Sequence, residues 1–170
     1  VNGLNPIKIS LDNYFVNRED NPVDENGEYD FETVKAIDIE LFNQNMLDLM
    51  EGKTIDLPKF SFEQGKRYYD GEKLSVKKKD LIIIEWIHGL TPELTNHIEE
   101  EYKYKIYVSA LTSISIDGHN LIKTSDNRLL RRMIRDAKYR GYTAQETISR
   151  WNSVRRGEDK NIFPYQEQAN

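Results

Sequence analysis

Four consecutive apolar residues, Leu81 to Ile84, are enclosed by Lys77-Lys78-Lys79-Asp80 on one side and by Glu85 on the other. A near-continuous apolar run of this length predicts a strand that is buried on both faces, as in a parallel sheet. A charge that directly follows such a run calls for an explanation, because a buried carboxylate needs a partner. The run therefore predicts a central strand that ends in a residue of functional interest, Glu85.

The rest of the chain alternates between extended and helical patterns. In chain order the expected elements are a strand at 7–11, a helix at 36–50, a hairpin formed by 54–62 and 66–74, a strand at 81–85, a short helix at 92–98, a strand at 104–108, and helices at 125–140 and 143–150. Strands that alternate with helices predict an α/β domain around a mostly parallel sheet. Such sheets bind ligands beyond the carboxyl ends of their strands. Asp12, which follows the first strand, and Glu85 should therefore lie near one crevice.

The expected helix at 125–140 carries an arginine pattern. Its arginines fall at i, i+3, i+4 and i+7, which places them along one face: Arg128, Arg131, Arg132 and Arg135. Guanidinium groups this close repel one another unless an anion lies among them, and their paired donors suit phosphate oxygens. One interpretation is therefore a phosphate-binding helix. The other is a solvated basic face that Asp126 and Asp136 neutralise, and the spacing alone leaves both open.

Composition bounds the alternatives. The length of 170 residues suits one domain, and no apolar run approaches the ~20 residues of a membrane helix. Cysteine is absent, which excludes disulfide and thiolate chemistry and favours a cytoplasmic protein. Residues 1–122 carry 13 basic and 23 acidic side chains, whereas residues 123–160 carry 11 basic and 5 acidic ones. A basic segment on an acidic body predicts a local anion site and argues against a surface that coats nucleic acid. The three histidines are too widely spaced for a zinc motif.

Four ordered motifs resemble one family. They are Ile9-Ser10-Leu11-Asp12-Asn13-Tyr14-Phe15, Tyr29-Asp30-Phe31-Glu32, Ile83-Ile84-Glu85 with His88-Gly89-Leu90, and Asp126-Asn127-Arg128-Leu129-Leu130-Arg131-Arg132. Together they resemble uridine kinase and its relatives in the uridine kinase/phosphoribulokinase group of P-loop kinases. The segments 155–158 and 161–166 are similar to a bacterial uridine kinase-like branch, in which the kinase domain often follows other domains. The resemblance implies one P-loop kinase-type domain over 1–170, with a small hairpin flap and an arginine-rich helical lid at about 123–160.

The resemblance also implies roles for particular residues. The expected activity is ATP-dependent phosphorylation of a nucleoside hydroxyl with Mg²⁺, in which Asp12 accepts the proton, Asp12 and Glu85 lie at the metal, and Arg132 is catalytic. The matching positions for substrate contacts are Tyr14, Phe31, Glu32, Phe60 and Arg128, and those for the phosphate-binding lid are Arg128, Arg131, Arg132 and Arg135. From the residues alone, Asp12 is open to a second interpretation as a turn or helix cap, and Phe31 and Phe60 as core packing.

The sequence departs from the family pattern in three places. It contains no G-x-x-x-x-G-K-[ST] motif, and Val1 to Pro6 resembles the end of a helix and a following loop. We therefore expect a chain cut from something longer, which lacks the first strand, the P-loop and its helix, and is inactive and prone to self-association as it stands. Trp86 follows Glu85 where the family has a small residue, and Gly65 lies near the position of a base-reading histidine.

Two other functions stay open at this point. One is a noncatalytic module whose arginine helix binds the phosphates of a nucleotide or RNA. The other is a kinase of the same group that acts on a different small alcohol or a sugar phosphate.

Overall fold

A parallel strand pair forms the centre of the domain. The computed structural model describes residues 3–23, 27, 29–31, 33–109, 115 and 117–170. Strand β1 (Asn5–Ser10) pairs in parallel with β6 (Asp80–Glu85), with Asn5 opposite Asp80 and Ser10 opposite Glu85. The α/β class and the strands expected at 7–11 and 81–85 are confirmed. The register brings the carboxyl ends of both strands to one edge of the sheet.

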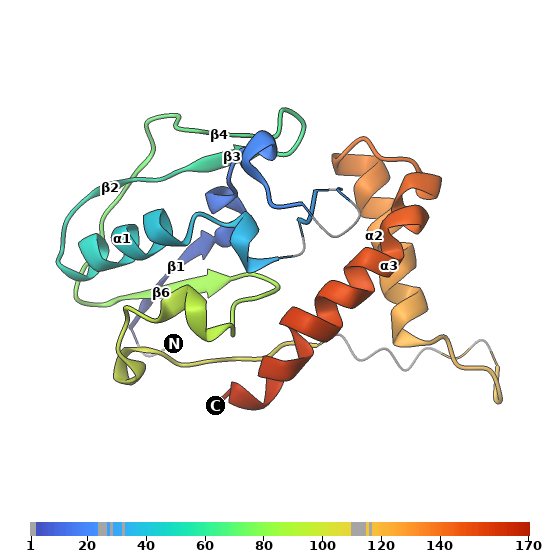
Figure 1. The fold of residues 1–170 in the computed structure, drawn as a ribbon. Coiled ribbons are helices and arrows are strands. Elements are labelled where there is room, and N and C mark those ends of the chain that lie inside the picture. Colours follow the sequence, from blue (N-terminus) through green and yellow to red (C-terminus); the bar gives the residue numbers. More distant parts are fainter. Residues whose placement is uncertain (1–2, 24–26, 28, 32, 110–114, 116) are drawn as a thin grey trace.

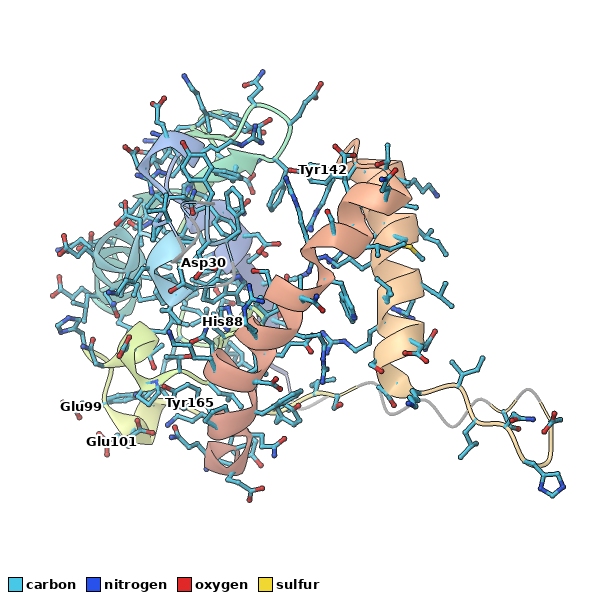
Figure 2. All side chains as sticks on the ribbon, turned by 45° about the vertical axis from the view of Figure 1, so that its right-hand side comes forward. Asp30, His88, Glu99, Glu101, Tyr142 and Tyr165 are labelled. Atoms are coloured by element: carbon cyan, nitrogen blue, oxygen red, sulfur yellow. The ribbon has the colours of Figure 1, made fainter. Side chains whose placement is uncertain are left out.

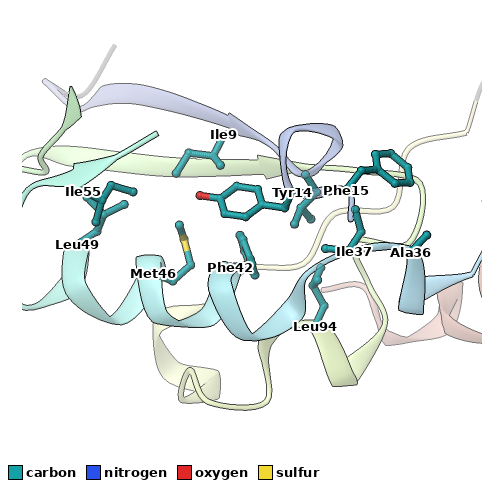
Figure 3. Packing of buried hydrophobic residues seen from close by; sticks show 11 residues of the cluster. Ile9, Tyr14, Phe15, Ala36, Ile37, Phe42, Met46, Leu49, Ile55 and Leu94 are labelled. Atoms are coloured by element: carbon teal, nitrogen blue, oxygen red, sulfur yellow. The ribbon is translucent and has the colours of Figure 1, made fainter. Parts of the chain in front are cut away.

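One helix covers the inner face of this strand pair. Helix α1 (Ile39–Met50) begins where the Asp38 carboxylate accepts a hydrogen bond from the Leu41 backbone N–H at 3.0 Å. It starts three residues later than expected, because residues 34–36 form a 3₁₀ turn before this cap. Phe42 packs edge to face against Tyr14 with ring centroids 5.3 Å apart, and Ile9, Met46 and Leu49 complete this part of the core (Figure 3).

The expected flap is present. Strand β3 (Lys59–Ser61) pairs in antiparallel fashion with β4 (Lys66–Tyr68), and β2 (Ile55–Asp56) pairs with β5 (Lys73–Leu74). The turn between β3 and β4 ends at Gly65, whose φ of +67° lies in the left-handed region that glycine adopts at low cost. A Cβ atom at Gly65 would lie 2.8 Å from the Arg18 side chain. Glycine is therefore required there for both backbone and packing reasons.

Two expectations about strands are wrong. Strand β6 is not buried on both faces, because Leu81 and Ile83 are 50% and 44% exposed and only the alternate residues, Ile82 and Ile84, pack on the core. The segment 104–108 forms no strand, although its composition favours one. Its backbone bonds to the chain end instead, since Asn170 N–H donates to the Lys105 carbonyl at 2.9 Å. Strand propensity alone is not enough where no neighbouring strand supplies a ladder of hydrogen bonds.

Two antiparallel helices lie on one side of the α/β body (Figure 1). Helix α2 spans Thr124–Tyr139 and α3 spans Ala144–Asn161, with the break at Gly141 confirmed by a φ of +71°. Helix α3 runs eleven residues beyond the expected end at Arg150, because Val154 and Glu158 are buried against its neighbours. The remaining 3₁₀ turns span residues 11–14, 18–20, 92–95, 100–102 and 163–168, and the turn at 92–95 replaces the short helix expected at 92–98. Within the described ranges, no helix has the length and apolar character needed to cross a membrane.

The start of α3 allows a first prediction. Thr143 and Glu146 form a reciprocal cap, in which Glu146 N–H donates to Thr143 Oγ1 at 3.3 Å and Thr143 N–H donates to Glu146 Oε2 at 2.7 Å. Thr143→Ala should therefore lower the free energy of unfolding by about 1 kcal/mol, measured by urea denaturation. Ser149→Ala is the matched control, because the Ser149 hydroxyl only bonds back to the Glu146 carbonyl inside the same helix. Equal stability of Thr143→Ala and Ser149→Ala would contradict the capping role.

Candidate active site

Two carboxylates meet at the carboxyl edge of the strand pair, as expected. Glu85 is the last residue of β6, and its Oε1 accepts a hydrogen bond from Ser10 Oγ at 3.0 Å and lies 3.2 Å from Lys8 Nζ. Asp12 lies two residues beyond β1, in the 3₁₀ turn at 11–14. The negative charge of Glu85 raises the pKa of Asp12, which places the two groups within electrostatic range of each other.

Some features of the surroundings of Asp12 raise the pKa of its carboxyl, and others lower it. Burial raises the pKa of the Asp12 carboxyl above its ordinary value, and the Glu85 charge adds to this. The guanidinium groups of Arg140 and Arg135, together with a hydrogen bond from the Trp86 side chain, act in the opposite direction. Asp12 is therefore a carboxylate of increased basicity that faces cations.

The four arginines of α2 divide into two groups. Arg128 forms an ion pair with Glu158 of α3, and Arg132 Nε lies 3.5 Å from Asp136 Oδ2. Glu158 and Asp136 are only 2% and 3% exposed. These two arginines are thus tied to buried acids, which agrees in part with the interpretation of α2 as an internally neutralised helix. Arg135, by contrast, lies within range of Asp12, and the Arg131 side chain is exposed.

Arg140 is a site residue that the sequence analysis missed. Its Nη1 lies 3.4 Å from Asp136 Oδ1, and its guanidinium carbon lies 4.9 Å from the ring centroid of Phe62. Its charge lowers the pKa of Asp12 more than that of Arg135 does. Burial, and then the charges of Arg140 and Arg132, lower the pKa of Arg135, so three guanidiniums crowd one another here. Such crowding favours a bound anion.

An aromatic cluster adjoins Asp12. The Phe15 ring lies 5.4 Å from Phe60, 5.9 Å from Phe62 and 6.3 Å from Trp86, centroid to centroid. Phe60 therefore belongs to the same aromatic cluster as Trp86, whose side chain lowers the pKa of Asp12 through a hydrogen bond. Trp86 also packs edge to face on buried His88 at 4.6 Å.

Of the other expected substrate contacts, two are described by the structure and one lies outside the described residues. Tyr14 is fully buried, and its hydroxyl accepts a hydrogen bond from Asn45 Nδ2 at 3.1 Å inside the core. Phe31 is half-buried and packs against Tyr29 at 6.0 Å. Glu32 lies outside the residues that the structure describes.

Two cavities lie apart from the carboxylates. One of about 450 Å³ is lined by residues of α1 and of the segment at 54–69, namely Leu41, Asn45, Asp48, Thr54, Ile55, Asp56 and Tyr69. The other, of about 210 Å³, lies beside the hairpin turn and is lined by Arg18, Glu19, Tyr29, Gln64, Gly65 and Lys66. Neither lining includes Asp12 or Glu85.

The carboxylates fit the requirements of Mg²⁺. No cluster of three or more metal-ligating side chains occurs among the residues described. Magnesium keeps several waters and commonly takes only one or two protein carboxylates beside substrate phosphates. Asp12 and Glu85, at the carboxyl edge of the strand pair, could supply that number.

Comparisons with known proteins identify the family of the chain. The family model described as "Phosphoribulokinase / Uridine kinase family" matches residues 9–170. A uridine kinase of Macrococcus caseolyticus is 28% identical over 152 residues, covering 89% of this chain and 65% of that protein. A uridine kinase of Staphylococcus epidermidis is 28% identical over 162 residues (95% of this chain, 70% of that protein), and one of Halobacterium salinarum is 27% identical over 147 residues (86% and 57%).

The match extends over nearly the whole chain, which spans 57 to 70% of the length of these three relatives. It includes both strand ends, the flap and the arginine helices. On this basis the chain belongs to the phosphoribulokinase/uridine kinase family.

Proposed function

We propose that the chain forms the acceptor and lid side of an ATP-dependent kinase, which phosphorylates the 5′-hydroxyl of a uridine- or cytidine-like nucleoside. The observation that carries the proposal is the setting of Asp12, a half-buried carboxylate within electrostatic range of Glu85, Arg135 and Arg140. Phosphoryl transfer needs little covalent chemistry from a protein. It needs a group that accepts the hydroxyl proton and cations that neutralise the transferring phosphoryl.

Each group has a proposed task. Asp12 accepts the proton of the acceptor hydroxyl, and burial makes it a better base than an exposed aspartate. Glu85 and Asp12 hold Mg²⁺, which offsets phosphate charge when ATP is bound. Arg132 and Arg135 of the lid neutralise the triphosphate together with Arg131. Substrate contacts are proposed for Phe60, Phe31 and Glu32, whereas Tyr14 and Arg128 would support the site through packing and the Glu158 pair.

Without a phosphate-binding loop these groups are not enough. The 170 residues contain no G-x-x-x-x-G-K-[ST] motif, whose backbone N–H groups and lysine hold the ATP phosphates in P-loop kinases. We therefore propose that these 170 residues alone do not transfer phosphate and need a P-loop that they do not contain. A cytoplasmic location, where ATP and nucleosides are available, is part of the same proposal.

The test is phosphoryl transfer from ATP–Mg²⁺ to a panel of nucleosides and small alcohols. It is run on this chain and on one extended upstream through a P-loop. We expect turnover only by the extended chain, with a nucleoside as the best acceptor. Preference for a different alcohol or a sugar phosphate would move the chain to another kinase of the group. An extended chain that binds ATP but phosphorylates nothing would contradict the proposal.

One observation favours a second candidate, a noncatalytic module that binds nucleotide or RNA phosphates. The Trp86 side chain bonds to Asp12, at the place where an acceptor hydroxyl would bind. Salt dependence separates the two candidates. An RNA-binding surface loses affinity steeply between 50 and 200 mM salt, on the order of 10³-fold for about six phosphate contacts, whereas a small enclosed site depends less on salt.

A further inference from the structure

The tip of the flap and the end of α2 meet at a stacked pair of side chains. The Arg140 guanidinium lies over the Phe62 ring at 4.9 Å, although the two residues belong to different hairpins. Guanidinium groups at this distance are attracted to the face of an aromatic ring. Figure 2 shows Tyr142, two residues further along, at the connection between α2 and α3 and beside the α/β body.

Arg140 and Phe62 are each held by other contacts, near the end of α2 and in the flap respectively. Arg140 is the residue after α2, and its Nη1 lies 3.4 Å from buried Asp136, which also accepts a hydrogen bond from Thr147 Oγ1 at 3.2 Å. Phe62 packs on Phe60 at 5.3 Å, and its carbonyl accepts a hydrogen bond from Arg18 Nη2 at 2.8 Å. The pair therefore joins two preorganised units and does not merely fill space within one of them.

We infer that Arg140 is a positioning residue that couples the β3–β4 hairpin to the α2–α3 hairpin, so that each is held more firmly when the other is in place. Arg140 is also within electrostatic range of Asp12 and Arg135. An anion bound among these guanidiniums then fixes Arg140 and, through Phe62, steadies the flap. Coupling of this kind is reciprocal, because each side must change the other by the same factor.

A purely local role makes a different prediction. If Arg140 only terminates α2 through Asp136, its loss disturbs α2 and leaves the flap unchanged. The two roles are separated by measuring each hairpin after a change in the other.

Amide hydrogen exchange, followed by mass spectrometry on the 170-residue chain, provides this measurement. Arg140→Gln is expected to speed exchange in residues 59–68, and Phe62→Leu in the last turn of α2, each by about two- to fivefold, the size of an exposed cation–π contact. Arg140→Lys, which keeps the charge but loses the planar stacking group, is the milder second variant and should act in the same direction. Exchange in the partner hairpin that stays at the wild-type rate in these variants would overturn the inference.

Arg155 offers a matched control within the same helix pair. Its Nη1 lies 2.7 Å from buried Glu158 and its guanidinium carbon lies 6.0 Å from the Phe163 ring, so it too has a buried acid and an aromatic neighbour. Phe163 belongs to the turn that follows α3, not to the flap. Arg155→Gln should leave exchange in residues 59–68 unchanged. An equal effect of Arg155→Gln on the flap would show general loosening of the lid and would also overturn the inference.

Sodium tripolyphosphate tests whether a bound anion steadies the flap through Arg140. In the wild-type chain it should slow exchange in residues 59–68, and this protection should disappear in Arg140→Gln. Binding without protection of the flap would overturn the coupling. This second arm rests on the proposed phosphate site, so a wild-type chain that does not bind tripolyphosphate would refute that site and the ligand part of the inference. The reciprocal substitutions would still decide the coupling between the hairpins.

Discussion

Asp12→Asn should lower phosphoryl transfer by about 10²- to 10⁴-fold, the usual contribution of a positioned general base, in a chain that carries the phosphate-binding loop. Asparagine keeps the size and one acceptor oxygen of the side chain but cannot take the proton of the acceptor hydroxyl. The loss should appear mainly in kcat, with acceptor binding close to wild type, because the proton acceptor acts only as the hydroxyl is deprotonated. The measurement is steady-state transfer from ATP–Mg²⁺.

A matched control is Asp56→Asn. Asp56 is an exposed carboxylate on β2 that lies 3.6 Å from Lys73 Nζ and takes no part in the proposed site. This variant should keep the wild-type rate. If Asp12→Asn retains more than about a tenth of the wild-type rate, the loss is well below that expected for a general base. That result would assign Asp12 to the turn and not to catalysis.

The pH profile provides a second check on Asp12. The base must be ionised to act, so activity is lost as the pH falls through its pKa. Burial raises this pKa above the ordinary value of 3.8. The acid limb of the profile should therefore lie at a higher pH than an exposed aspartate would give, and Asp12→Asn should remove it from the residual activity.

The largest expected effect on stability comes from Asp136. This residue is 3% exposed and is in contact with Thr147 Oγ1 at 3.2 Å, Arg140 Nη1 at 3.4 Å and Arg132 Nε at 3.5 Å. Asp136→Ala removes the acid and leaves two guanidiniums close together without it. The free energy of unfolding should fall by about 3 kcal/mol, the lower end for a broken buried ion pair, since both arginines retain some exposure. Urea denaturation measures the change.

Asp126→Ala is the control for this effect. Asp126 is an exposed acid in the first turn of the same helix. Its replacement removes one favourable interaction with the helix dipole, so the free energy of unfolding should fall by only about 0.3–1 kcal/mol. Asp136→Asn keeps an acceptor for Thr147 but removes the charge, so its cost should lie between those of the two alanine variants. Similar stabilities of Asp136→Ala and Asp126→Ala would show that the buried acid does not hold the helix pair.

Local pattern was sufficient for elements whose contacts are close in sequence or strongly apolar. The run at 81–84 and the glycines at 65 and 141 predicted a strand, a hairpin turn and a helix break that the structure confirms. The strand predicted at 104–108 was wrong, because its side chains favour a strand but the described structure provides no neighbouring strand for it to pair with. Helix α3 continues past Arg150 for a tertiary reason, the burial of Glu158 between Arg128 and Arg155, which spacing within α3 does not reveal.

In the candidate site, too, local pattern predicted some features, whereas others depend on tertiary contacts. Asp12 and Glu85 could be brought together from the sequence, because the ends of parallel strands share an edge. The arginines could be placed on one face of a helix, but not sorted into those bound to buried acids and those near Asp12. Arg140 lies outside the i, i+3, i+4, i+7 series, and its role depends on Phe62, a residue 78 positions earlier in the sequence.

The position of Trp86 has a practical consequence. The chain contains two tryptophans, Trp86 and Trp151, and only the first lies in the aromatic cluster beside Asp12. Replacing Trp151 by Phe leaves one indole emitter at the candidate site. Binding of the proposed acceptor beside Asp12 should change the surroundings of this indole and hence its fluorescence, which would report acceptor binding without label or turnover.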